Sequence, residues 1–334
     1  MTGLLHAGLD ALFADPEVSE ILLNGGGRAF VERGGRLEAV AVGLDEAAIR
    51  RLVERIIAPL GLRLDRSSPM VDARLPDGSR LHAVLAPVAI DGTCVAIRRF
   101  GSARRQLGDF ALAPPGADLL RWAVLAGWNV LLSGGTGAGK TTLLNVLAGG
   151  LSPGERIVTI EETAELALGQ PHVVRLEARP ANAEGAGAVP VRALVRAALR
   201  LRPDRLVVGE VRGEEAFDLL QALNTGHCGS LCTIHANGPG EALARLESLV
   251  LLAGVGLPLD AIRAQIRASV DAVVHVARRP GGRRAIEAIA EIAGPTGLRL
   301  LYPPGAEGGL PTRPPRHSDV AAFDPGGAHV DQAA

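Results

Sequence analysis

The sequence predicts an α/β protein in which a P-loop nucleotide-binding core follows a small α+β N-terminal domain. Three observations lead to this fold class: a glycine-rich phosphate-loop motif in mid-chain, short apolar strands that alternate with helical stretches after it, and hairpin-like strands before it. A chain of 334 residues has room for two such domains. We expect the N-terminal domain at residues 1–100, a linker at 101–117, the core at 118–302 and a disordered tail rich in Pro, Gly and Ala at 303–334.

The N-terminal domain is predicted from alternating helix-like and hairpin-like patterns. Leu4 to Phe13 and Asp45 to Leu60 carry apolar residues at helical spacing. Apolar strands flank the turns Gly25–Gly27 and Pro76–Gly78, and another strand runs from Cys94 to Phe100. Several of these strands end in arginines, which either serve a binding site or are charges at solvated strand edges. These arginines are Arg74, Arg80, Arg98 and Arg99.

The phosphate-loop motif, Gly134–Thr141, lies in the context that its chemistry requires. The apolar run Val130–Leu132 precedes it like a buried strand, and Thr141–Leu147 follows like a helix. Glycines let backbone N–H groups surround phosphates, the helix N-terminus adds partial positive charge, Lys140 reaches the β- and γ-phosphates, and Thr141 can hold Mg²⁺. A glycine-rich turn before an ordinary helix is the alternative. We expect ATP and Mg²⁺ as ligands, and the expected nucleotide-binding residues are Gly134, Gly135, Thr136, Gly137, Ala138, Gly139, Lys140, Thr141 and Thr142.

Lys140 is the only lysine of the chain, so every other permanently cationic side chain is an arginine. A compact ammonium suits a point charge beneath two phosphates better than the planar fork of a guanidinium. Chance survival of one lysine is the alternative, but its coincidence with the loop argues for a function in phosphate binding.

Beyond the loop, short apolar strands alternate with helical stretches, which is typical of a layered α/β sheet. A helix through Leu119 to Leu125 precedes the loop, and two helices occupy Glu241 to Val270. Two further helices are expected at Val191–Leu201 and Gly213–Leu223. The expected strands are Arg156–Ile160, His172–Leu176, Arg205–Val208, Ser230–Ile234, Ala272–Ala277 and Ala285–Ile292.

Acidic residues follow two of these strands, at the edge where parallel sheets bind ligands. Glu161 and Glu162 would hold Mg²⁺ through water or orient the attacking water, although acids are also common at a solvated helix start. Glu210 ends an apolar strand in the Walker B pattern, which is weak alone and stronger downstream of a phosphate loop. We expect Glu210 to coordinate Mg²⁺ together with Thr141, or to activate water.

Two histidines, His227 and His235, flank the strand Ser230–Ile234. A lone histidine in such a place is usually structural. Cys228 and Cys232 lie close to them in the sequence, but the spacing matches no known Cys/His metal cluster.

Composition restricts the class of protein. The formal net charge is −1 with acids and arginines interleaved, so no general basic surface points to nucleic acid. Three cysteines, an odd number, suggest reduced thiols and a cytoplasmic protein. No signal-peptide pattern and no apolar run near the ~20 residues of a membrane span is present, so we expect no direct membrane insertion.

In combination, these motifs resemble those of the type II/type IV secretion superfamily of hexameric ATPases. They are most similar to the CpaF/TadA branch, which powers tight-adherence pili and related conjugal-transfer systems. The resemblance covers Leu9 to about Ile292. It rests on Ser67–Arg80, the Walker A loop, an Asp box at Ile160–Glu165, the Walker B segment Gly209–Gly213 and a His box at Thr225–Asn237.

The resemblance implies a RecA-like core, a homohexameric ring and nucleotide in the cleft between the two domains. It implies that Glu210 is the Walker B glutamate and that Arg98 and Arg99 neutralise transition-state charge. One departure is that Glu162 replaces the usual aspartate of the Asp box, and another is a short N-terminal region. The remaining implied roles are phosphate and Mg²⁺ binding by Lys140 and Thr141, Asp-box membership for Glu161 and Glu162, and γ-phosphate sensing by His227 and His235.

The implied function is a Mg²⁺-dependent ATP hydrolase, cytoplasmic and peripheral at the inner face of the cell membrane. It would drive Flp/Tad-type pilus assembly or type II/IV secretion through an inner-membrane platform protein. A DNA translocase-type motor of a conjugal transfer system is the alternative, although aromatic stacking platforms for single strands are lacking in the sequence. A scaffold that binds ATP without hydrolysing it and a small-molecule kinase are further alternatives, the last without a lid-like segment.

Overall fold

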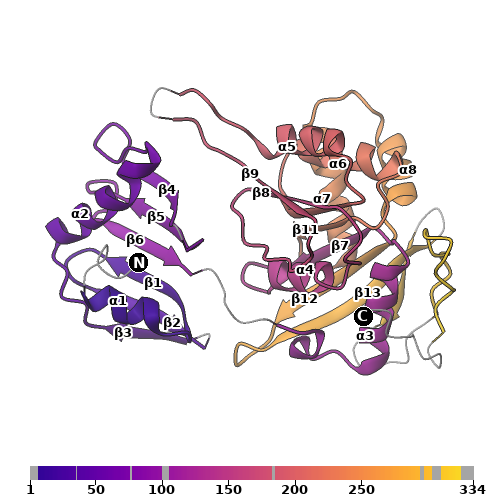
Figure 1. The fold of residues 1–334 in the computed structure, drawn as a ribbon, viewed down its shortest axis with the longest axis horizontal. Coiled ribbons are helices and arrows are strands. Elements are labelled where there is room, and N and C mark those ends of the chain that lie inside the picture. The colour runs from indigo at the N-terminus through magenta and orange to yellow at the C-terminus, as the bar shows by residue number, and fades with distance from the viewer. Residues whose placement is uncertain are drawn as a thin grey trace. The chain divides into compact units, whose positions relative to one another are not determined.

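The computed structural model describes residues 7–34, 36–75, 77–99, 105–182, 185–293, 297–302 and 310–324. The chain divides into two compact units, shown in Figure 1. One comprises Met1–Arg104 with Pro180–Ala188, and the other comprises Arg105–Arg179 with Val189–Ala334.

The N-terminal unit, coloured indigo to purple in Figure 1, is built on an antiparallel sheet. Its six strands have the order β3-β2-β1-β6-β5-β4. Helix α2 buries Ile49 and Val53, and the side chain of Asp45 caps it by accepting a hydrogen bond from the Ala48 amide. The elements are α1 (Ala7–Ala14), β1 (Val18–Asn24), β2 (Ala29–Arg33), β3 (Arg36–Val40), α2 (Glu46–Ile57), β4 (Met70–Arg74), β5 (Arg80–Val84) and β6 (Cys94–Arg98).

The second unit contains an eight-stranded sheet of order β14-β13-β12-β7-β11-β10-β8-β9. The strands from β12 to β9 pair in parallel, whereas β13 and β14 are antiparallel at one edge. Its strands are β7 (Val130–Gly134), β8 (Ile157–Glu161), β9 (Val173–Glu177), β10 (Arg205–Val211), β11 (Leu231–His235), β12 (Ala272–Arg278), β13 (Arg284–Ala293) and β14 (Gly297–Tyr302). Its helices are α3 (Pro114–Leu125), α4 (Lys140–Ala148), α5 (Val191–Ala198), α6 (Glu215–Asn224), α7 (Pro239–Leu252) and α8 (Leu259–Ser269).

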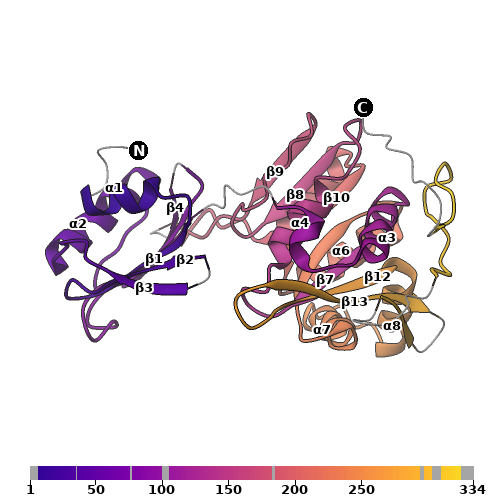
Figure 2. The same ribbon diagram turned by 90° about the horizontal axis from the view of Figure 1, so that it is seen from below.

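Helices cover both faces of this sheet, as Figures 1 and 2 show. Val130 and Leu132 of the central strand β7 pack in a hydrophobic cluster with α3 and α4, whereas Leu131 packs in a second cluster with α5 to α8. Since successive side chains of a strand point to opposite faces, β7 is buried on both sides. The arrangement confirms the predicted fold class, a RecA-like α/β core with a small N-terminal domain.

The linker predicted at 101–117 is too long. Leu107 and Phe110 form part of a short 3₁₀ helix, Leu107–Phe110, and are buried in the core of the second unit. Helix α3 then begins at Pro114, a residue type that suits the first turn. These few apolar residues between prolines and glycines are too sparse to show a period, although they belong to the core. Residues 101–104 lie outside the described part of the chain.

The tail predicted as disordered is also in part ordered. Residues 310–324 lie against the second unit, where Trp122 Nε1 donates to the Ala321 carbonyl at 2.8 Å and Trp128 Nε1 to the Pro314 carbonyl at 3.1 Å. The rest of the predicted tail, 303–309 and 325–334, is not described. Backbone carbonyls of the described part of the tail accept these hydrogen bonds from the two tryptophans. Such contacts leave no apolar period in the sequence from which they could be predicted.

Arginines of the same segment neutralise a buried carboxylate. Asp271, whose side chain is 3 % exposed, accepts from Arg313 Nη1 at 2.7 Å and from Arg316 Nε at 2.6 Å. It also accepts from the Asn129 amide at 2.8 Å. A buried charge is tolerated when it is paired in this way, so the segment contributes to the core domain that it covers.

Among the helices that the structure describes, none has the length and apolar character to cross a membrane.

Candidate active site

The phosphate loop follows β7, and its conformation and close contacts favour glycine at several of its positions. A Cβ built on Gly134 would lie 2.4 Å from the Val276 carbonyl oxygen of the neighbouring strand β12. Gly137 and Gly139 have φ angles of 69° and 100°, which side-chain-bearing residues rarely adopt. The first N–H groups of α4 have no partner within the helix. They therefore follow directly on a loop backbone whose φ angles favour glycine. The remaining predicted phosphate-binding residues lie in the loop or the first turn of α4: Gly135, Thr136, Ala138, Lys140, Thr141 and Thr142.

Lys140 is folded back onto the loop. Its Nζ donates to the carbonyl oxygens of Gly134 at 2.9 Å and Gly135 at 3.0 Å, and lies 3.5 Å from His235 Nδ1. The side chain is buried, and this burial lowers the pKa of Lys140 although the nearby Glu210 opposes the shift. The ammonium is thus held at the mouth of the loop by weak acceptors, which phosphate oxygens would outcompete.

Glu210 lies at the same edge of the sheet and is shared by two partners. Its Oε2 accepts from Arg212 Nη2 at 2.6 Å, and its Oε1 lies 3.7 Å from His235 Nδ1. The Nη1 of Arg212 donates to Glu162 Oε2 at 2.6 Å. The hydrogen bond that Arg212 donates to Glu210 raises the pKa of Arg212, so the guanidinium remains charged and bridges the two carboxylates.

Glu161 differs from Glu162 in being buried. Its Oε1 accepts from the amides of Glu165 at 2.8 Å and Leu166 at 3.0 Å, whereas Oε2 is buried without a hydrogen-bond partner. Burial raises the pKa of Glu161 to about 7. A Cβ on Gly209 of the adjacent strand would lie 3.0 Å from Glu161 Cγ, so glycine at that position makes room for the carboxylate.

The two predicted histidines lie at opposite edges of the sheet, one before the start of the inner strand β11 and the other at its last residue. His235 ends β11 in register with Gly134, and its Nε2 lies 3.4 Å from Thr136 Oγ1 in the phosphate loop. His227 precedes β11, and its Nδ1 contacts the Ala222 carbonyl at the end of α6. Strand β11 therefore lies between the two histidines, and only His235 is next to the phosphate loop of its own chain.

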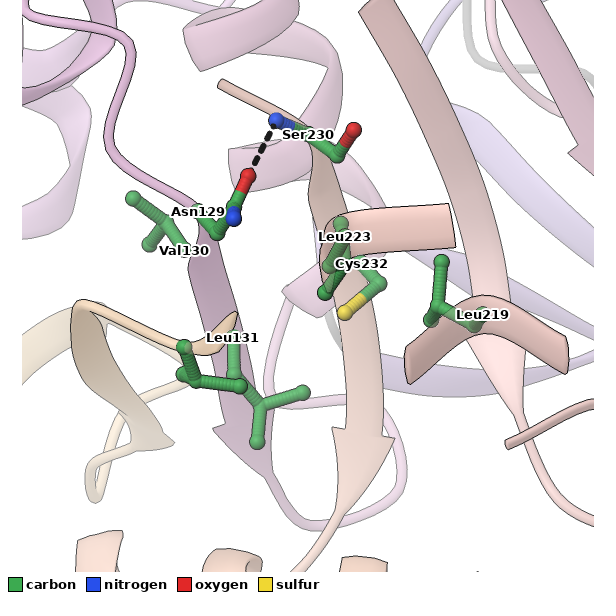
Figure 3. A pocket seen from close by; sticks show the side chains of 8 residues that line it. Asn129, Val130, Leu131, Leu219, Leu223, Ser230 and Cys232 are labelled. Atoms are coloured by element: carbon green, nitrogen blue, oxygen red, sulfur yellow. Dashed lines mark hydrogen bonds between the residues drawn. The ribbon is translucent and has the colours of Figure 1, made fainter. Parts of the chain in front are cut away.

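Figure 3 shows this opposite edge, where the Asn129 side chain accepts from the Ser230 amide at 2.9 Å. The hydroxyl of Ser230 donates to the His227 carbonyl at 2.9 Å. The small cavity there is lined mainly by apolar residues and by Cys232, and burial raises the pKa of the Cys232 thiol to about 12. The cavity belongs to the core packing, and the thiol stays protonated and unreactive.

The two predicted arginines belong to the N-terminal unit and differ in their contacts. The guanidinium of Arg99 donates to the carbonyls of Asp15 and, at 2.9 Å, of Val18, so it holds the start of β1. Arg98 is exposed at the end of β6 in register with Glu20 of β1. Arg99 is therefore held within its own unit.

Several residues around the loop were missed by the sequence analysis. Ser133 Oγ lies 3.0 Å from Nδ1 of the buried His275, directly before the loop, and burial lowers the pKa of His275. Arg278 and Arg284, of the hairpin that joins β12 to β13, lie next to loop glycines. Arg212 was visible two residues after Glu210, where strand alternation places both side chains on one face.

The residues present fit ATP and Mg²⁺. Gly134 has no space for a side chain beside the Val276 carbonyl, and Gly139 has a φ angle of 100°, so the loop needs glycine at both positions. Thr141 would supply a hydroxyl and Glu210 a carboxylate, the oxygen donors that Mg²⁺ prefers. Lys140 and the free amides of α4 would take the phosphates.

Comparison with known proteins places the chain in a family. The model of the family described as type II/IV secretion system protein matches residues 6–293. A putative conjugal transfer protein of Mycobacterium tuberculosis is 46% identical over 301 residues, covering 86% of this chain and 85% of its own. The conjugal transfer protein TrbB of Rhizobium radiobacter is 35% identical over 282 residues, covering 82% and 84%.

Solved structures agree in fold. The ATPase DotB of Legionella pneumophila superposes with a TM-score of 0.64 at 20% identity, covering 88% of this chain and 83% of its own. The pilus retraction motor PilT superposes with a TM-score of 0.58 at 18% identity, covering 89% and 82%.

Proposed function

Since the chain belongs to the type II/IV secretion system protein family, we propose that it is a Mg²⁺-dependent ATPase that converts ATP hydrolysis into mechanical work. The observation that carries the proposal is the convergence of three side chains on the phosphate loop. Lys140 Nζ lies 3.5 Å from His235 Nδ1, which in turn lies 3.7 Å from Glu210 Oε1. A cation, an acid and a histidine at the mouth of a phosphate loop suit phosphoryl transfer to water.

Each side chain has a distinct role in this proposal. Lys140 and the loop amides bind the phosphates, and Thr141 and Glu210 would hold Mg²⁺, which would supply positive charge beside the phosphates when bound. Glu210 also orients the attacking water, while Arg212 fixes its carboxylate. His235 links Glu210 to Thr136 in the loop, so it can report the occupancy of the γ-phosphate position.

The machine that receives the work is a Flp/Tad-type pilus assembly system or a type II/IV secretion system. We propose a homohexamer in the cytoplasm, peripheral to the inner face of the membrane and docked on an inner-membrane platform protein. Relatives named for conjugal transfer and for type IV secretion support a membrane-associated transport machine.

A DNA translocase-type motor of a conjugal transfer system is the second candidate. The names of the relatives favour it, since those 46% and 35% identical are both described as conjugal transfer proteins. The two candidates differ in their response to nucleic acid. Stimulation of ATP hydrolysis by single- or double-stranded DNA would favour the translocase, and indifference to DNA would favour the secretion or pilus motor.

The proposed function is tested by phosphate release together with the solution mass from light scattering, with and without Mg²⁺ and a non-hydrolysable ATP analogue. We expect Mg²⁺-dependent hydrolysis and a shift toward six subunits, both lost in Lys140→Ala. Hydrolysis at the same rate in Lys140→Ala would refute the ATPase assignment. Hydrolysis by a monomer would support the ATPase activity but contradict the proposed hexameric ring.

A further inference from the structure

The hairpin that joins β12 to β13 extends past the end of its neighbour β7. Strands β12 and β7 pair in parallel as far as His275 and Ser133. β7 then ends at Gly134 and continues into the phosphate loop. β12 continues to Arg278. The close approach of the Val276 carbonyl to Gly134 shows that this continuation runs directly beside the loop.

Two arginines of this hairpin touch the loop glycines. A Cβ built on Gly139 would lie 2.6 Å from Cδ and 2.9 Å from Nε of Arg284. A Cβ built on Gly137 would lie 3.7 Å from Nη1 of Arg278. Gly139 thus cannot carry a side chain while Arg284 occupies this position. Both side chains reach the backbone of the loop where it passes into α4.

Strand register explains why these two arginines, of the four at the hairpin end, face the loop. Arg278 and Arg284 are directly opposite each other in the antiparallel pair, so their side chains share one face. Arg279 and Arg283 follow on the other face, and Arg279 Nε pairs with Glu287 Oε1 at 3.2 Å. The hairpin therefore presents one arginine pair to the loop and the other pair away from it.

We propose that Arg278 and Arg284 bind the phosphate chain of the nucleotide held by the loop of their own chain. This inference rests on the proposed nucleotide site. A guanidinium offers paired N–H donors that match phosphate oxygens. Lys140 provides one cationic side chain at the loop, and the hairpin pair places two more beside it.

The position of the pair selects the phosphates that it binds. Gly137 and Gly139 stand in the part of the loop whose amides cradle the α- and β-phosphates. Arg278 and Arg284 therefore contact oxygens that ADP and ATP share, and their contribution persists after the γ-phosphate has left.

Isothermal titration calorimetry of the full chain with ADP and with AMP-PNP tests the proposal in Arg278→Gln and Arg284→Gln. Each substitution is expected to weaken both nucleotides by roughly tenfold, the effect of one charge-assisted hydrogen bond. Arg283→Gln is the matched control on the other face of the same hairpin. Its affinity should stay close to that of the unsubstituted protein.

Unchanged affinity in both variants, or an equal loss in Arg283→Gln, would overturn the proposal. Arg284→Lys guards against a folding defect, because it keeps the stem beside Gly139 and the charge but loses the paired donors. We expect Arg284→Lys to bind both nucleotides with intermediate affinity. Full affinity in both Arg284→Lys and Arg278→Gln would also refute phosphate binding by this arginine pair. A parent protein that binds neither nucleotide would instead refute the proposed function.

Discussion

Arg212 holds Glu210 with a hydrogen bond of 2.6 Å while its second terminal nitrogen holds Glu162 at the same distance. One guanidinium therefore holds the carboxylate of Glu210 beside that of Glu162, the acid that follows β8. In Arg212→Gln, Glu210 loses this partner, and we expect kcat to fall by roughly tenfold to a hundredfold with little change in ADP affinity. Phosphate release under saturating ATP measures the effect.

The control for this substitution is Arg263→Gln, which removes another ion pair, to Glu247 at 3.1 Å between α8 and α7. It should leave kcat unchanged. A comparable loss in both variants would mean that Arg212 acts through stability rather than through Glu210.

His235 and His227 provide a second test, because the structure places them at opposite ends of β11. His235→Asn removes the group between Glu210 and Thr136, and we expect kcat to fall by roughly tenfold or more. As an unassembled chain, His227→Asn should hydrolyse ATP at the same rate as the unassembled parent protein. A loss in His227→Asn that appears only in assembled rings would show that this edge acts between subunits.

Glu161 predicts a dependence of stability on pH. Its pKa is about 7 in the folded protein, raised from 4.5, so between these values the folded state binds the proton more tightly than the unfolded state. The contribution of Glu161 to the free energy of unfolding therefore decreases as pH rises from about 4.5 to about 7. Glu161→Gln abolishes this loss, so the variant should gain stability relative to the parent by roughly 3 kcal/mol across this window. Urea unfolding at several pH values measures the difference, and a difference independent of pH would contradict the assignment.

The segment 310–324 predicts a stability effect far from the phosphate loop. Replacing both Arg313 and Arg316 by Ala leaves the buried carboxylate of Asp271 without its cationic partners. We expect the free energy of unfolding to fall by roughly 3 kcal/mol, with a change in tryptophan emission as the segment leaves Trp122 and Trp128. The added substitution Asp271→Asn should recover part of this loss. Equal unfolding midpoints in parent and double variant would show that the segment adds nothing to the domain.

The core of the second unit was predictable because its strands are buried on both faces and so appear as continuous apolar runs. β3 was not predicted; it is a short strand that is exposed along most of its length, and Leu37 is 64% exposed. The hairpin arginines were visible in the sequence, but their proximity to the loop depends on strand register. The order of the tail was not predicted, because most of its contacts use carbonyl groups and arginines and only isolated apolar residues, Val320 and Phe323, pack against the core.

The single lysine gives the protein an uncommon chemical simplicity. An amine-selective reagent meets one side-chain target, the ammonium of Lys140, and that target is packed against the carbonyls of Gly134 and Gly135. A lysine-specific protease likewise has one cleavable peptide bond, inside α4. Labelling and cleavage of the whole chain are therefore readouts of one loop, whereas lysine-directed cross-linking is blind to every other surface.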